Sequence, residues 1–226
     1  MINIDQRLKS ISDLIDNPNS YVADIGTDHA YLPIYLVQAK IACYVYATDI
    51  NKGPLFNAKK DIARYKLEKQ IETRLGSGLQ PILSVDKLDT VIISGMGGNL
   101  ISKIMDDAHK IKHKVKYVFG PNASEINLRK WLFENGYIIT GEKIIKNQKK
   151  IYELITAEKG QSKVKPKMAD FLLGPYLRKE KNQIFIEKWT EELRKRLIIL
   201  ENQKKSNTPI FSANLKQQIK IIEENL

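Results

Sequence analysis

The sequence contains a single cysteine, Cys43, so no disulfide can form within its 226 residues. A chain without disulfides fits a reducing compartment such as the cytosol. Charged residues at positions 5, 7 and 9 interrupt the N-terminus before any apolar run, so we expect no secretory signal peptide. No apolar run reaches the roughly 18 residues that a transmembrane helix needs. We therefore expect a cytoplasmic protein that has no membrane partner.

Acidic residues are in the minority. The chain has 37 Lys and Arg against 26 Asp and Glu, a net charge of +11. Residues 141–226 alone have 19 Lys and Arg against 11 Asp and Glu, a net charge of +8. A basic surface attracts a polyanion such as nucleic acid. The alternative is an ordinary solvated surface of a lysine-rich protein, and charge alone leaves both open.

The chain is organised around one stretch near its N-terminus. Residues 21–25 have strand character, Gly26 permits a sharp turn and the close approach of a ligand, and a helical segment follows. Asp24 ends the strand and Asp28 lies in the turn, where open α/β sheets bind ligands. Because like charges repel, two acids disfavour a pyrophosphate and suit a cationic, hydroxyl-rich ligand such as S-adenosylmethionine. The alternative is that Asp28 only caps the helix.

Strand-like and helix-like segments alternate along the first 160 residues. The expected strands are residues 21–25, 43–50, 71–75, 89–94, 115–119, 137–146 and 150–157. The expected helices are residues 6–16, 31–40, 53–67, 99–110 and 124–134. Five alternating units followed by a hairpin indicate an α/β fold, with a doubly wound sheet and an antiparallel edge hairpin.

Polar residues and glycines recur where the expected strands end. Asp49 ends the second strand 23 residues beyond Gly26, close to the spacing at which a carboxylate reaches a ribose diol. Glycine-rich residues 76–78 and 95–98 follow the third and fourth strands, and Asn122 comes soon after the fifth. Glycines let the backbone approach a ligand closely, although a merely flexible loop is the alternative. The sequence therefore predicts a ligand site at this edge of the sheet.

The pattern changes at about residue 161. Residues 161–167 form a polar, basic linker, and two apolar seams follow, joined by a turn at 203–209. The seam residues are Ile186, Trp189, Leu193, Leu197, Leu200, Phe211, Leu215, Ile219, Ile222 and Leu226. Their spacing predicts a C-terminal antiparallel helical domain, coiled-coil-like, over residues 161–226. Its basic residues favour an RNA-binding arm, with an oligomerisation arm as the alternative.

Together these segments resemble the bacterial tRNA (adenine-N1)-methyltransferases that modify adenine 22. The resemblance covers nearly the whole chain, and two runs are specific to that family, Asp28-His29-Ala30-Tyr31-Leu32-Pro33 and Gly95-Met96-Gly97-Gly98. The other matching segments are Arg7-Leu8, Asp24 to Thr27, Gly53-Pro54, Pro121-Asn122, Arg129 to Leu132, Tyr152-Glu153 and Gly174-Pro175. Two residues depart from the family. The family usually has an acid at the position of Ser77, and it often has Gln at the position of Gly120.

The resemblance implies a class I, Rossmann-like methyltransferase domain over residues 1–160 that binds S-adenosylmethionine, and a tRNA-binding helical domain over residues 161–226. The expected cofactor-binding residues are Asp24, Gly26, Thr27, Asp28, His29, Asp49, Ile50, Ser77, Gly78 and Gly95. The expected catalytic residues, which would line the pocket of the target base, are Gly95, Met96, Gly97 and Asn122. The expected nucleic-acid-binding residues are Arg7, Arg129, Arg178, Lys179, Lys181 and Lys188. Arg7 is expected near the mouth of the site, against a phosphate.

The implied reaction is an in-line displacement in which adenine N1 attacks the sulfonium methyl group. N1 has a free in-plane lone pair at neutral pH, so no strong general base is needed. We expect the rate of methyl transfer to depend mainly on the positioning of the two reactants. Because N1 lies on the Watson–Crick edge, the base must be unpaired or flipped out. There are two alternatives for the function: a methyltransferase that acts on another RNA base, or a non-catalytic RNA-binding protein with this fold. A nicotinamide-dependent oxidoreductase is disfavoured because Gly-x-Gly-x-x-Gly does not follow the first strand. We expect a monomer without a metal.

Overall fold

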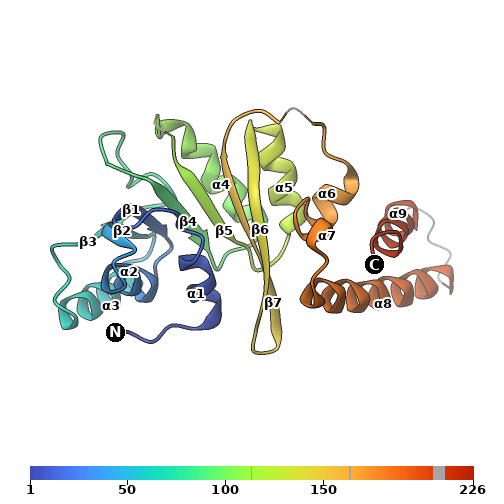
Figure 1. The fold of residues 1–226 in the computed structure, drawn as a ribbon, viewed down its shortest axis with the longest axis horizontal. Coiled ribbons are helices and arrows are strands. Elements are labelled where there is room, and N and C mark those ends of the chain that lie inside the picture. Colours follow the sequence, from blue (N-terminus) through green and yellow to red (C-terminus); the bar gives the residue numbers. More distant parts are fainter. Residues whose placement is uncertain (113, 163, 206–211) are drawn as a thin grey trace.

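The fold is an α/β sheet with a helical region at one end. A computed structural model describes residues 1–112, 114–162, 164–205 and 212–226. Within them the sheet has seven strands in the order β3-β2-β1-β4-β5-β7-β6 (Figure 1). The strands are β1 (Ser20–Ile25), β2 (Ala42–Asp49), β3 (Ile71–Leu75), β4 (Thr90–Ser94), β5 (Lys116–Gly120), β6 (Tyr137–Asn147) and β7 (Lys150–Lys159). The predicted doubly wound sheet with an edge hairpin is confirmed.

The middle of the sheet is parallel and apolar. β1 pairs in parallel with β2 on one side and with β4 on the other. Val22, Ala23, Val91 and Ile92 of the two central strands are fully buried, as expected for strands covered on both faces. Because the chain order reverses between β1 and β4, a crevice opens at their carboxyl ends.

Helices cover both faces of the sheet. They are α1 (Gln6–Ser12), α2 (Tyr31–Gln38), α3 (Lys52–Arg64), α4 (Gly98–Met105) and α5 (Glu125–Glu134). Helices α1, α2 and α3 share one apolar cluster with the sheet, and α4 and α5 share another. The helix expected at 99–110 ends at Met105 because its last turn tightens into the 3₁₀-helix η1 (Asp106–Lys110).

β6 and β7 form the predicted hairpin at the edge of the sheet. β7 runs antiparallel to β5, and β6 runs antiparallel to β7. The strands meet at a two-residue turn in which Gln148 has a φ of +54°. Figure 1 shows the hairpin extending well beyond the other strands, on the side of the sheet where α1 lies.

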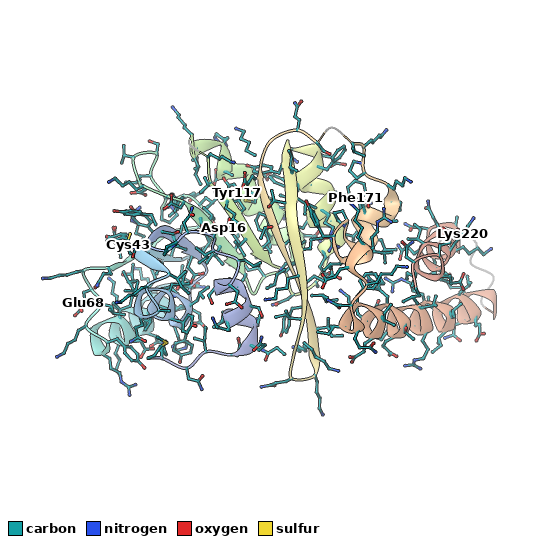
Figure 2. All side chains as sticks on the ribbon, viewed as in Figure 1. Asp16, Cys43, Glu68, Tyr117, Phe171 and Lys220 are labelled. Carbon is teal, nitrogen blue, oxygen red and sulfur yellow. The ribbon has the colours of Figure 1, made fainter. Side chains whose placement is uncertain are left out.

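The C-terminal helices are α6 (Met168–Leu173), α7 (Leu177–Glu180), α8 (Gln183–Lys205) and α9 (Ser212–Glu223). An apolar cluster joins Phe185 and Trp189 of α8 and Ile222 of α9 to Ile144 of β6. Figure 2 shows Phe171 of α6 on the side of this region that adjoins the sheet. The helical region therefore shares a core with the edge of the sheet, and the division at residue 160 stays a prediction.

The predicted apolar seams of α8 and α9 are buried only in part. Trp189 and Ile222 are buried, whereas Leu197 is 40% exposed. Figure 2 shows Lys220 at the outer side of α9. The turn predicted at 203–209 is wrong for residues 203–205, because α8 continues to Lys205. The rest of that turn and Phe211 lie outside the described residues, so the coiled-coil character stays a prediction. Within the described ranges, none of the helices combines the length and apolarity needed to cross a bilayer.

Candidate active site

A cleft of about 610 Å³ opens at the carboxyl ends of β1, β2 and β4. Every residue predicted to bind a cofactor lines it: Asp24, Gly26, Thr27, Asp28, His29, Asp49, Ile50, Ser77, Gly78 and Gly95. Met96, Asn122 and Arg7 line it too. The topology thus gathers loops that lie far apart in the sequence.

The turn after β1 brings the backbone close to the cleft. Gly26 has a φ of +79°, and a Cβ there would lie 2.3 Å from Cε of Met96. The N–H groups of Gly26 and Thr27 both donate to the Thr48 carbonyl, at 2.8 and 2.9 Å. Helix α2 begins with Ala30 as its N-cap and has no side-chain cap. The alternative that Asp28 only caps this helix is therefore wrong.

Two nearly buried carboxylates stand side by side in the cleft. Asp24 and Asp49 are only 5% and 8% exposed. The two Asp49 oxygens accept the N–H of Asn51 at 2.8 Å and of Asp28 at 3.4 Å. Burial is the main reason that the pKa of Asp24 is raised to about 6; the negative charge of Asp49 adds to the rise and the positive charge of Arg7 opposes it. A bound cation would favour the ionised form of Asp24.

Arg7 of α1 lies within the cleft. Its Nη1 atom is buried and has no hydrogen-bond partner among the described residues. Its guanidinium carbon lies 5.8 Å from the centre of the Tyr152 ring, which also lines the cleft. The buried Thr48 hydroxyl likewise lacks a partner within the described ranges. Because buried polar groups are normally hydrogen-bonded, these two atoms indicate a polar ligand.

The glycine-rich loop after β4 forms a ledge beside Gly26. Gly95 has a φ of +80°, and the Asn122 side-chain amide donates to its carbonyl at 2.7 Å. The Asn122 backbone N–H donates to the Met96 carbonyl at 2.8 Å. Asn122 therefore holds the ledge in shape. Gly97 is the N-cap of α4 and is not among the residues that line the cleft.

Apolar side chains at the mouth of the cleft are unusually exposed. Tyr31, Ile50 and Leu100 line the cleft and are 44%, 63% and 50% exposed. The His29 ring stacks on Tyr31 at a centroid distance of 5.2 Å. A flat apolar ligand would cover this surface. Leu100 is a cleft residue that the sequence patterns missed, because it lies in the first turn of α4, just after the glycine-rich run, and belongs to no motif.

The structure corrects one of the predicted nucleic-acid contacts and shows acidic partners at two others. Arg129 is fully buried between Glu142, at 2.7 Å, and Glu153, at 2.5 Å, so it presents no surface to RNA. Lys188 is largely buried and contacts Glu153 at 2.8 Å. Arg178 is bound to Asp170 at 2.7 Å. Arg129 and Lys188 bind glutamates of β6 and β7 and so stabilise the junction between the sheet and the C-terminal helices, whereas the Arg178 pair lies within those helices.

Two further predicted contacts, Lys179 and Lys181, are exposed near the end of α7. No ion pair is found for either lysine among the described residues, so both keep their predicted role. Across the same residues no group of three or more His, Cys, Asp or Glu is arranged to hold a metal ion.

The doubly wound sheet, the single-glycine turn and the acids at the ends of β1 and β2 define a class I, Rossmann-like methyltransferase. The chain belongs to the TrmK family, tRNA (adenine(22)-N(1))-methyltransferase, whose model matches residues 22–224. The resemblance seen in the sequence is thereby confirmed.

Relatives of known sequence and structure agree with this assignment. The tRNA (adenine(22)-N(1))-methyltransferase of Bacillus subtilis is 35% identical over 85% of this chain and 82% of its own length. The crystal structure of the B. subtilis m1A22 tRNA methyltransferase TrmK has a TM-score of 0.87 and 32% identity, covering 100% of this chain and 99% of that one. M. capricolum TrmK, solved with S-adenosyl-homocysteine, has a TM-score of 0.85 and 33% identity, covering 98% and 96%.

Proposed function

We propose that the protein transfers the methyl group of S-adenosylmethionine to N1 of adenine 22 in tRNA. The observation that carries this function is the pair of nearly buried carboxylates, Asp24 and Asp49, beside the ledge at Gly95 and Met96. That the target is adenine 22 is inferred from the family, whereas the residues of the cleft support the binding of S-adenosylmethionine and the transfer of its methyl group.

The charges in the cleft fit the amino-acid end of S-adenosylmethionine. This end is a zwitterion. The cleft has Asp24 for the ammonium group and, for the carboxylate, the Arg7 guanidinium, whose Nη1 atom has no hydrogen-bond partner among the described residues. We therefore assign Arg7 to the cofactor rather than to a phosphate. Asp49 lies at the end of the adjacent strand, where it suits the ribose diol.

The opposite end of the cleft suits the adenine of the cofactor. Ser77 and Gly78 line it, and Gly78 has a φ of +53°. A Cβ at Gly78 would lie 3.1 Å from the side chain of Ile104. Without an acid at Ser77, this pocket relies on backbone groups and apolar contact, with Ile104 as its wall.

When bound, S-adenosylmethionine supplies a methyl group on a sulfonium, which a nitrogen lone pair displaces. The residues of the chain position the target base rather than remove a proton from it. The Met96 side chain lies against Gly26, Asn122 holds the loop after β4 in shape, and the exposed side chains of Tyr31 and Leu100 offer apolar surface for a flipped base. His29 faces two carboxylates, Asp28 at 3.8 Å and Asp61 at 3.7 Å, and needs no role as a base.

The test is transfer of a labelled methyl group to unmodified tRNA, followed by primer extension to locate a block. We expect one new stop at adenine 22, and none with an adenine-to-guanine tRNA variant at that position. A stop at another base would favour the alternative substrate. An absence of transfer by a folded protein that binds S-adenosylmethionine would favour a non-catalytic RNA-binding role.

A further inference from the structure

The tip of the β6–β7 hairpin lies beside the catalytic cleft. The Asn147 side-chain amide donates to the carboxylate of Asp5 at 3.0 Å, and Asp5 precedes Arg7 by two residues. On the other strand Lys150 precedes Tyr152 by two residues, about 7 Å along a strand. Because both Arg7 and Tyr152 line the cleft, the tip is fixed near its rim.

The hairpin tip presents two positive charges without acidic partners. Lys149 and Lys150 are both exposed, and neither forms an ion pair with a described residue. Lysines farther along β6 differ, because Lys146 is bound to Glu187 and Lys143 lies 3.6 Å from Asp13. Apart from Lys159 at the far end of β7, the hairpin lysines that form no ion pair with a described residue lie at the tip, beside the cleft.

The cations of α8 have a different environment. Lys188, Arg194 and Arg196 each contact a glutamate, so local acids partly neutralise them. A phosphate approaching this part of the helix would meet the acid as well as the cation, which weakens the attraction. The hairpin tip is thus the better phosphate-binding surface near the cleft.

We propose that Lys149 and Lys150 bind phosphates of the tRNA next to the target adenine and so hold the backbone while that base enters the cleft. This inference rests on the proposed function and adds a docking element outside the C-terminal helices. Phosphate contacts set the position and orientation of a nucleic acid without reading its sequence. A flipped base needs such a fixed backbone, because its own stacking and pairing are lost.

The first test compares two double charge reversals, K149E/K150E and K66E/K69E. Lys66 and Lys69 are also exposed, but they precede β3 and lie at the end of the sheet opposite the cleft. We expect K149E/K150E to raise the Kd for tRNA at least tenfold and to lower the slope of log K against log salt by about two. We expect the control to stay within about twofold of the wild type.

The affinity for S-adenosylmethionine is measured by calorimetry on both variants and is expected to stay unchanged. Equal effects of the two reversals on tRNA binding would overturn the hairpin role while leaving the proposed function intact. Failure of the wild type to bind tRNA would overturn the proposed function, and this inference with it.

The second test locates the hairpin on the RNA. A photo-crosslinking amino acid is placed at Gln148, whose side chain is exposed at the turn. We expect crosslinks to nucleotides neighbouring adenine 22. Crosslinks confined to distant arms of the tRNA would reject the proposal, even if the reversed charges had weakened binding.

Discussion

In the cleft, buried polar groups lack complete partners, whereas the cations of α8 as far as Arg196 already contact acids. Within the described residues, the Nη1 atom of Arg7 has no partner, and burial raises the pKa of Asp24 because its charge is not fully compensated. Arg196, by contrast, is bound to Glu192. The net charge of a region therefore does not locate a ligand site, and the unsatisfied groups are the better guide.

The largest effect is expected at Arg129, which was predicted from the sequence to contact RNA. Arg129→Met leaves Glu142 and Glu153 buried with less compensation, so we expect a loss of about 3–5 kcal/mol in the free energy of unfolding. Chemical denaturation measures it. Arg178→Met, at a partly exposed pair, serves as the control and is expected to cost much less. Equal losses in the two variants would contradict the structural role of Arg129.

Within the cleft, Asp49→Ala is expected to reduce the affinity for S-adenosylmethionine by about 2–3 kcal/mol, because the ribose loses hydrogen bonds to a charged group. Calorimetry measures the affinity, and thermal melting checks that the fold survives. Asp61→Ala is a matched control, since Asp61 lies near His29 but does not line the cleft. If Asp49→Ala bound S-adenosylmethionine as tightly as the wild type, the proposed contact between Asp49 and the ribose would be rejected.

Asp24→Asn is expected to change cofactor affinity and protein stability in opposite directions. The pKa of Asp24 is raised from 3.8 to about 6 in the folded chain, so its ionisation destabilises the cofactor-free protein as the pH rises through this window. At pH 7.5 the variant is expected to be more stable than the wild type by up to about 3 kcal/mol, and to bind cofactor less tightly. The difference in unfolding free energy should shrink toward pH 4. If the variant were less stable than the wild type at pH 7.5, the claim that the ionised Asp24 carboxylate destabilises the cofactor-free protein would be wrong.

The difference between the cleft and the ion-paired cations also explains which features could be predicted from the sequence. Strand ends and glycine turns follow from local pattern, and the rule that parallel strands end at one edge brings Asp24, Asp49 and Gly95 together. The burial of Arg129 depends on partners 13 and 24 residues away, on two different strands. No local pattern distinguishes such a cation from an exposed one. Arg7 was found by the family resemblance, but its place inside the cleft depends on how α1 packs.

The smallest effect is expected on the outer face of α8. Arg194 contacts Glu191 at 2.9 Å, and its side chain is 65% exposed. Because exposed pairs contribute little, Glu191→Gln should leave the melting temperature unchanged, while it frees the guanidinium. If the hairpin and not this face of α8 binds the phosphates, tRNA affinity should stay within about twofold of the wild type. A clear gain in affinity would mean that α8 also lies against the RNA and that Glu191 partly masks its charge, which would narrow the difference between the two surfaces.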